Sequence, residues 1–342
     1  MSARPPATPF TRHAGVEVPL LCGAMYPCSN PELVAAVSEA GGLGVVQPLS
    51  LAYVHGHDLR SGLRRIRELT DRPIGFNAIV ERSSRRYLER MIAWVGLALE
   101  EGVRFFVTAL GKPGRVVEMV HGAGGRVYHD VTARRWAEVA RDEGVDGLIC
   151  VNNRAGGHAG TLDAAALFAE LADLGLPLVA AGGAGDERAF VELIRLGYAG
   201  VQMGTRFIAT PECRVHPDYR QAIVAAAEDD IVLTDRLSGV PVSVIRTPLI
   251  DRLGPGLGPI SRRLLRHPRT KHLMRALLAL RSVRRLKRSA LRGVGYRDVW
   301  QAGRSVAGIH EILPAAEVVR RCRQALAAAD SAVPPSRKDG AI

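Results

Sequence analysis

Several features are scarce or missing in this 342-residue chain. It has no run of roughly 18 apolar residues that could cross a bilayer, and its first ten residues contain no apolar signal core. Its five cysteines are scattered, odd in number and free of any Cys-x-x-Cys pair. These absences disfavour a membrane span, a secretory signal, a disulfide framework and a zinc site, and they predict reduced thiols in the cytoplasm.

Catalytic motifs of several enzyme classes are also missing. The chain has no Gly-x-Ser-x-Gly elbow, and the expected strand ends carry neither His-x-x-x-His nor a cluster of carboxylates. We therefore expect no metal.

Acidic residues are missing from one long segment. Residues 252–297 hold 14 lysines and arginines and no aspartate or glutamate. Since the net charge of the whole chain is +12, the net charge of the remaining residues is −2. Three interpretations stay open for this basic segment: a lid that binds a phosphate-rich substrate through its arginines, a helix that contacts anionic lipid or a partner, or a cap with solvated charges. Aromatic residues are nearly absent from it, so we expect no nucleic acid.

The rest of the chain alternates short apolar segments with amphipathic ones. Eight nearly continuous apolar segments, each followed by a helix or turn, predict parallel strands that are buried on both faces. The expected strands are Leu20–Ala24, Leu43–Gln47, Pro73–Val80, Val103–Leu110, Arg126–Asp130, Asp146–Val151, Pro177–Ala181 and Gly200–Met203. Eight such units in about 200 residues favour an α/β fold, a (β/α)8 TIM barrel, over a doubly wound open sheet.

The barrel hypothesis divides the chain into five parts. We expect a loose N-terminal arm over residues 1–18, the barrel over 19–209, and an inserted, mainly helical cap or lid after strand eight over 210–303. A final barrel helix over 304–330 and a loose tail over 331–342 complete the chain.

Glycine turns follow the last three expected strands, where a barrel carries its active site. Gly156 and Gly157 precede His158, an acid/base candidate with an ordinary pKa near 6.5; a solvated turn histidine is the alternative. The pair Gly182-Gly183 and the pair Gly204-Thr205 follow strands seven and eight, and such turns favour a phosphate-bearing ligand.

Three polar or soft side chains at other strand ends are further candidates. Asn77 could hydrogen-bond a heterocycle or be a buried structural amide, and Lys112 could meet a ring carbonyl or phosphate or lie on the surface. Met25 could lie against a ring or fill the core. His129 and Asp130 end strand five at the same rim.

These motifs, in this order, resemble the nitronate monooxygenase family. The resemblance rests on Ala24-Met25, Ala40-Gly41-Gly42-Leu43-Gly44, Ala155-Gly156-Gly157-His158-x-Gly160, Gly182-Gly183 and Gln202-Met203-Gly204-Thr205-Arg206-Phe207, and resumes at Ser238–Pro241 and Trp300–Gly303. It implies a TIM barrel with non-covalent FMN, its phosphate on the last two turns, contacts from Asn77 and Gly156, and His158 as the base.

The resemblance implies oxidation of alkyl nitronates by O2 to carbonyl compounds and nitrite. The same fold also serves FMN-dependent NADH or NADPH reductases of enoyl-thioesters or quinones, and a non-catalytic protein that contacts a membrane or partner is a third possibility. We therefore expect a cytoplasmic enzyme with a small-molecule substrate, and a homodimer is among the assemblies we consider. The chain departs from the family pattern at two places. Arg154 stands where the family usually has a glutamate, and Asn152-Asn153 stand at the end of strand six, where the family usually has Gln-Gly. Because Arg154 reverses the charge at this position, we expect it to favour an anionic substrate or carrier.

Overall fold

The structure is a computed structural model that describes residues 7–81, 84–236, 240–254, 256, 278, 284–292 and 299–331. Most of the basic segment, including the expected lid arginines and most of the expected basic helix, lies outside these residues, as do residues 332–342 of the expected tail.

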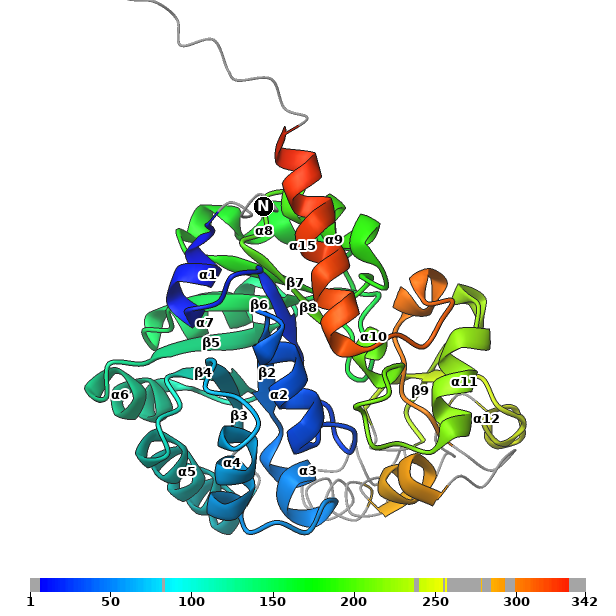
Figure 1. Cartoon of the computed structure of the whole chain (residues 1–342), viewed down its shortest axis with the longest axis horizontal. Helices are drawn as coiled ribbons and strands as arrows, with labels where there is room; N and C mark the ends of the chain where they lie inside the picture. Colours follow the sequence, from blue (N-terminus) through cyan, green and yellow to red (C-terminus); the bar gives the residue numbers. More distant parts are fainter. Residues whose placement is uncertain are drawn as a thin grey trace, which may run out of the picture.

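Eight parallel strands close into a barrel in chain order (Figure 1). They are β1 (Leu20–Cys22), β2 (Leu43–Val46), β3 (Ile74–Ile79), β4 (Phe105–Ala109), β5 (Arg126–Val131), β6 (Gly147–Val151), β7 (Leu178–Ala181) and β8 (Gly200–Met203). The pairing of β1 with β8, with Leu21 opposite Gln202, completes the ring. The predicted TIM barrel is confirmed, and the open sheet is excluded.

Helices surround the barrel, because the apolar outer faces of the strands must be covered. The ring comprises α2 (Pro31–Glu39), α3 (Pro48–Tyr53), α4 (Leu59–Arg67), α5 (Arg85–Glu100), α6 (Gly114–Gly122), α7 (Arg134–Asp142), α8 (Ala164–Leu171) with the 3-10 turn η1 (Ala172–Leu174), α9 (Glu187–Arg195) and the short α10 (Thr205–Ile208). Apolar residues fill both the barrel interior and the space between strands and helices.

The N-terminal arm is not loose in its described part. Residues 9–14 form helix α1 (Pro9–Ala14), which Thr8 caps, and Phe10 is fully buried in the barrel interior against Phe105 and Tyr128. The arm is ordered because this aromatic side chain closes the end of the barrel where the strands begin. The proline-rich composition of the arm gave no indication that Phe10, Thr11 and Ala14 are buried.

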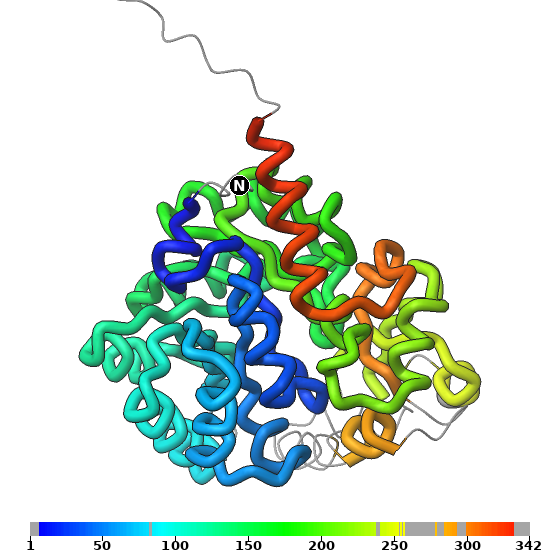
Figure 2. The backbone as a smooth tube through the Cα atoms, viewed as in Figure 1, coloured from blue at the N-terminus to red at the C-terminus, as the bar shows by residue number. Residues whose placement is uncertain are grey.

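The last helix begins later than expected. Arg304–Gly308 form a 3-10 turn, η4, and helix α15 runs over Ala315–Ser331, so Ser331 belongs to the helix and not to the tail. Helix α15 packs on α9 and α2 and closes the helical ring between them (Figure 2). Pro314, directly before the helix, favours a start at this point.

The insertion after β8 contains strands as well as helices. Its described elements are α11 (Pro217–Ala225), η2 (Glu228–Asp230), β9 (Ile231–Thr234), β10 (Val242–Ile245), α12 (Pro248–Leu253) and a helical stretch at 284–292. Strands β9 and β10 form an antiparallel ribbon that the sequence analysis did not predict. In the described part of the chain, no helix combines the length and the apolar character that crossing a bilayer requires.

Candidate flavin and substrate site

The barrel brings the turns after β6, β7 and β8 together at one end. We call residues 152–160 loop 6, residues 182–185 the β7 turn and residues 204–205 the β8 turn. Asn152, fully buried, links the first two: its Nδ2 donates to the Gly182 carbonyl at 2.9 Å, and its Oδ1 accepts from the Arg154 N–H at 2.8 Å. Loop 6 is therefore fixed to the β7 turn by one side chain.

The β7 turn requires glycine for two reasons. Gly182 has φ +115°, a conformation that L-residues rarely adopt. A Cβ added to it would lie 2.4 Å from the Asn152 Oδ1 and 2.6 Å from the Ala155 N–H nitrogen. Gly183 has φ +91°, and its missing Cβ would lie 3.2 Å from the Arg154 Nε. The two glycines thus allow loop 6 to pack directly on the turn.

Unused backbone donors are present at both turns. Within the described part of the chain, the N–H groups of Gly183 and Gly204 donate no hydrogen bond. The buried Thr205 hydroxyl accepts from the Gly303 N–H at 3.0 Å, which leaves its own proton to donate. Bare N–H groups and a hydroxyl donor are the groups that bind a phosphate, so the two turns fit the phosphate of a flavin nucleotide.

Loop 6 also packs against the returning chain. A Cβ on Gly156 would lie 2.9 Å from the Gly303 nitrogen and 3.5 Å from the Thr205 Oγ1, and the Arg304 N–H donates to the Arg154 carbonyl at 3.0 Å. The predicted residues Gly156 and Thr205 therefore lie together, although 49 positions separate them in the sequence. Gly303 was part of a recognised motif, but its role in joining the turns was missed.

His158 lies at the exposed tip of loop 6. Gly157, with φ +69° and open space at its missing Cβ, turns the backbone, and its carbonyl accepts from the Ser243 N–H of β10 at 2.8 Å. The ribbon of the insertion therefore supports the histidine loop. Partial burial among protein atoms lowers the pKa of His158, so its imidazole is neutral near pH 7.

Three other predicted residues face the same end of the barrel. Asn77 is buried on β3, and strand alternation places it on the inner face, since its neighbours Phe76 and Ala78 belong to the outer core. Met25 lies against Gly204, whose missing Cβ would be 3.5 Å from its Sδ. Gln202 turns toward β1, where its side chain lies beside Gly23.

Lys112 is engaged elsewhere. Its ammonium pairs with the Glu143 Oε1 at 2.9 Å, and 63% of its side chain is exposed. The turn after β4 directs the Lys112 side chain to the surface of the protein, which is the alternative location that the sequence analysis had left open. We therefore leave Lys112 out of the site.

The charge of Arg154 is paired with a carboxylate of the insertion. Both of its terminal nitrogens contact the two carboxylate oxygens of Glu228, each at 2.7 Å, in a bidentate ion pair. Glu228 comes from η2 in the insertion, 74 residues away, and nothing in its sequence context marked it as a partner. From the sequence we expected Arg154 to favour an anionic substrate or carrier, and the ion pair with Glu228 was not predicted.

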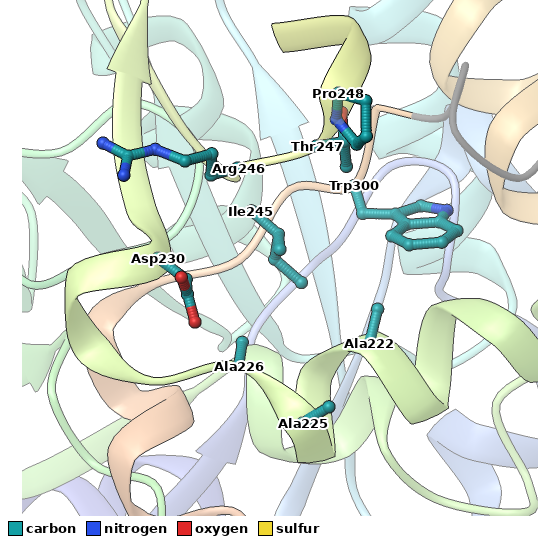
Figure 3. A pocket seen from close by; sticks show the side chains of 9 residues that line it. All are labelled: Ala222, Ala225, Ala226, Asp230, Ile245, Arg246, Thr247, Pro248 and Trp300. Atoms are coloured by element: carbon teal, nitrogen blue, oxygen red, sulfur yellow. The ribbon is translucent and has the colours of Figure 1, made fainter. Parts of the chain in front are cut away.

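A separate pocket lies within the insertion (Figure 3). It has a volume of about 400 Å³ and is lined by Ala222, Ile245, Pro248 and Trp300, with Arg246 at its edge. It contains none of the predicted site residues. Elsewhere in the described residues, no group of three or more histidine, cysteine, aspartate or glutamate side chains is arranged to hold a metal ion.

Comparisons with known proteins agree with this geometry. The family described as nitronate monooxygenase matches residues 7–322. A nitronate monooxygenase of Pseudomonas aeruginosa is 30% identical, over 91% of this chain and 97% of its own.

Two further proteins that are similar to this chain are not named as nitronate monooxygenases. The (3aS,4S,5R,7aS)-5-hydroxy-7a-methyl-1-oxo-octahydro-1H-indene-4-carboxyl-CoA dehydrogenase of Mycobacterium tuberculosis is 30% identical, over 73% of this chain and 69% of its own. The structure of FabK from Thermotoga maritima is 28% identical and superposes with a TM-score of 0.77, over 95% of this chain and 98% of its own.

Proposed function

The chain belongs to the nitronate monooxygenase family of oxidoreductases, and we propose that it is an FMN-dependent enzyme that converts alkyl nitronates and O2 to carbonyl compounds and nitrite. One observation carries the proposal. Loop 6 with His158 and the turns after β7 and β8 are joined directly by Asn152 and by the contact of Gly156 with Thr205 and Gly303.

The phosphate of FMN is assigned to the β7 and β8 turns. The N–H groups of Gly183 and Gly204, which donate no hydrogen bond within the described residues, and the Thr205 hydroxyl supply donors, and Gly182 permits the backbone conformation of the turn. No cation is needed, because backbone donors bind phosphate directly.

The ring of the flavin is assigned to the inner wall beside these turns. Asn77 offers an amide that both donates and accepts, while Met25, Gly156, Gly157 and Gln202 border the same end of the barrel. These residues would hold and orient the ring, and FMN bound there would supply the electron-transfer chemistry that the oxidation of a nitronate by O2 requires.

His158 acts next to the substrate. Its neutral imidazole can take a proton from an acidic carbon or donate its N–H to a nitronate oxygen, and it adds no positive charge. The main-chain bond from Ser243 holds the loop in place, so the ring does not depend on a flexible turn.

A test begins with flavin content. The purified full-length chain should bind FMN, and an alkyl nitronate under air should yield nitrite and a carbonyl compound in equal amounts. A chain that takes up no FMN would refute the cofactor assignment.

The second candidate is an NADH- or NADPH-dependent reductase of an enoyl-thioester or quinone. The similarity to a dehydrogenase whose name gives a carboxyl-CoA compound favours it. An anaerobic titration of the FMN-loaded chain decides between the two candidates. Bleaching of the flavin absorbance by NADH or NADPH would support the reductase, whereas a flavin that ignores both but reacts with a nitronate would support the monooxygenase.

A further inference from the structure

One carboxyl group in the barrel mouth has no role in the function proposed so far. Asp130 is near the carboxyl end of β5, where Tyr128 lies in the barrel interior and His129 faces outward. His129 is buried and bonded to the Thr108 hydroxyl at 2.8 Å. Since side chains alternate along a strand, Asp130 faces inward like Tyr128, one layer nearer the strand ends.

This layer lies beside loop 6. Asp130 pairs in register with Ile149 of β6, the strand that leads into the loop. Two residues after Asp130, Thr132 contacts the end of loop 6, because a Cβ on Gly160 would lie 3.5 Å from the Thr132 Cβ. The carboxyl group therefore borders the same mouth as the glycine turns.

One oxygen of this carboxyl group lacks a hydrogen-bond partner among the described residues. Its Oδ1 is buried and makes no hydrogen bond to the described part of the chain. Burial raises the pKa of Asp130 from 3.8 to about 7. Burial also lowers the pKa of His129, on the same strand, to about 4, so this ring is neutral.

The neighbouring strands supply no compensating charge. Strand β4 carries no ionisable side chain, and β6 contributes the buried Cys150 thiol, whose pKa is raised by burial and by Asp130 itself. His158 on loop 6 is neutral. A buried carboxyl in such surroundings is more stable with its proton, and the protonated group has an O–H to donate.

We propose that Asp130 is a further flavin-binding residue that, as a neutral carboxylic acid, donates a hydrogen bond to an acceptor atom of the flavin ring. The inference rests on the proposed FMN site. A planar ring with carbonyl oxygens and ring nitrogens supplies the partner that Oδ1 lacks, and Asn77 and Asp130, on β3 and β5, then hold the ring from the inner wall.

The proposal predicts a pH dependence of binding. Once the carboxyl group is ionised in the free protein, FMN binding must take up a proton, so the affinity falls by up to about tenfold for each pH unit above the pKa. Asp130→Asn keeps an N–H donor of similar shape but cannot titrate, so its affinity should not follow this slope.

The experiment titrates the full-length, flavin-free chain with FMN and separately with riboflavin, following flavin fluorescence between about pH 6 and about pH 8.5. Riboflavin has no phosphate, so its binding reports the ring alone. The control is Asp142→Asn, which removes an exposed carboxylate on α7 that pairs with Arg141. Wild type and control should lose affinity for both ligands above pH 7, and Asp130→Asn should not.

Each alternative result has a distinct meaning. A wild-type chain that binds flavin with no pH slope, or an Asp130→Asn chain with the wild-type slope, overturns the role of Asp130 alone. A wild-type chain that binds neither ligand refutes the flavin site itself.

Infrared difference spectra cover the case in which Asp130→Asn does not fold. With ¹³C-labelled aspartate in the wild-type chain, a protonated carboxyl band should persist at neutral pH and shift when FMN is added. Absence of the band would overturn the proposal.

Discussion

Replacement of Gly182 by alanine tests the central packing of the site. The residue has φ +115°, and the new Cβ would lie 2.4 Å from the Asn152 Oδ1, 2.6 Å from the Ala155 nitrogen and 2.9 Å from the Ala155 Cα. Two of these three atoms belong to the backbone, so loop 6 must move away from the β7 turn. Gly175, at the end of η1, is the matched control, because its φ is +73° and nothing lies within 4 Å of its missing Cβ.

The two variants separate backbone strain from packing. Gly175→Ala pays for the left-handed conformation alone, about 1–2 kcal/mol. Gly182→Ala adds an overpacking term of about 1–3 kcal/mol, so the total is about 2–5 kcal/mol. With an unfolding entropy of about 2.1 cal/mol/K per residue over 342 residues, each kcal/mol lowers Tm by about 1.4 °C.

The measurements are thermal unfolding by circular dichroism and FMN binding by fluorescence. We expect Tm to fall by about 1–3 °C for Gly175→Ala and by about 3–7 °C for Gly182→Ala. Only Gly182→Ala should weaken FMN binding, by about tenfold or more, because only this change displaces the phosphate turn. If both variants melt alike and bind FMN like the wild type, the assignment of the β7 turn is refuted.

Three further predictions concern single side chains. Because burial lowers the pKa of His158 below 6.5, kcat/KM should rise with pH through a limb whose midpoint lies below pH 6.5, and His158→Gln should keep FMN but lose this limb together with most of the turnover. A variant that loses FMN instead would contradict the role of His158 as the base. Lys112→Ala should leave the Kd for FMN unchanged. It should lower the free energy of unfolding by less than about 1 kcal/mol, since only the exposed ion pair with Glu143 is lost. Weaker FMN binding by this variant would show that Lys112 does belong to the flavin site. Glu228→Gln should loosen loop 6 and raise KM, because it removes the charge that pairs with Arg154. A double-mutant cycle with Arg154→Gln, measured by urea unfolding, should give a coupling free energy of up to about 1 kcal/mol. Additive effects of the two substitutions would mean that the bidentate pair does not stabilise the loop.

The barrel was predictable because its signals are local. Each strand is a short apolar segment followed by a turn and an amphipathic helix, and the eight units follow one another in the chain as they do in the ring. The observed structure differs from the predicted boundaries at places where a single residue determines the local structure. Phe10 orders an arm whose composition suggested a loose segment, and Pro314 marks the start of the last helix.

The contacts between turns were not predictable in this way. Gly182 could be recognised as a turn glycine, but the Asn152 side chain that fills the space of its missing Cβ comes from loop 6, which follows a different strand. The partnership of Arg154 with Glu228 and the support of Gly157 by Ser243 join residues that are 74 and 86 positions apart. The direction of Lys112 depended on the turn that precedes it.

The sequence by itself determined the parallel barrel, the order of its strands and the identity of the glycine turns, since hydrophobic periodicity and backbone freedom are properties of neighbouring residues. Only the tertiary structure decided which side chains are desolvated and which charges are paired. Arg154 is balanced by Glu228, whereas the buried Oδ1 of Asp130, near the end of an ordinary strand, has no hydrogen-bond partner in the part of the chain that the structure describes. Burial and pairing depend on residues distant in the chain, and these two effects set the chemistry of the barrel mouth.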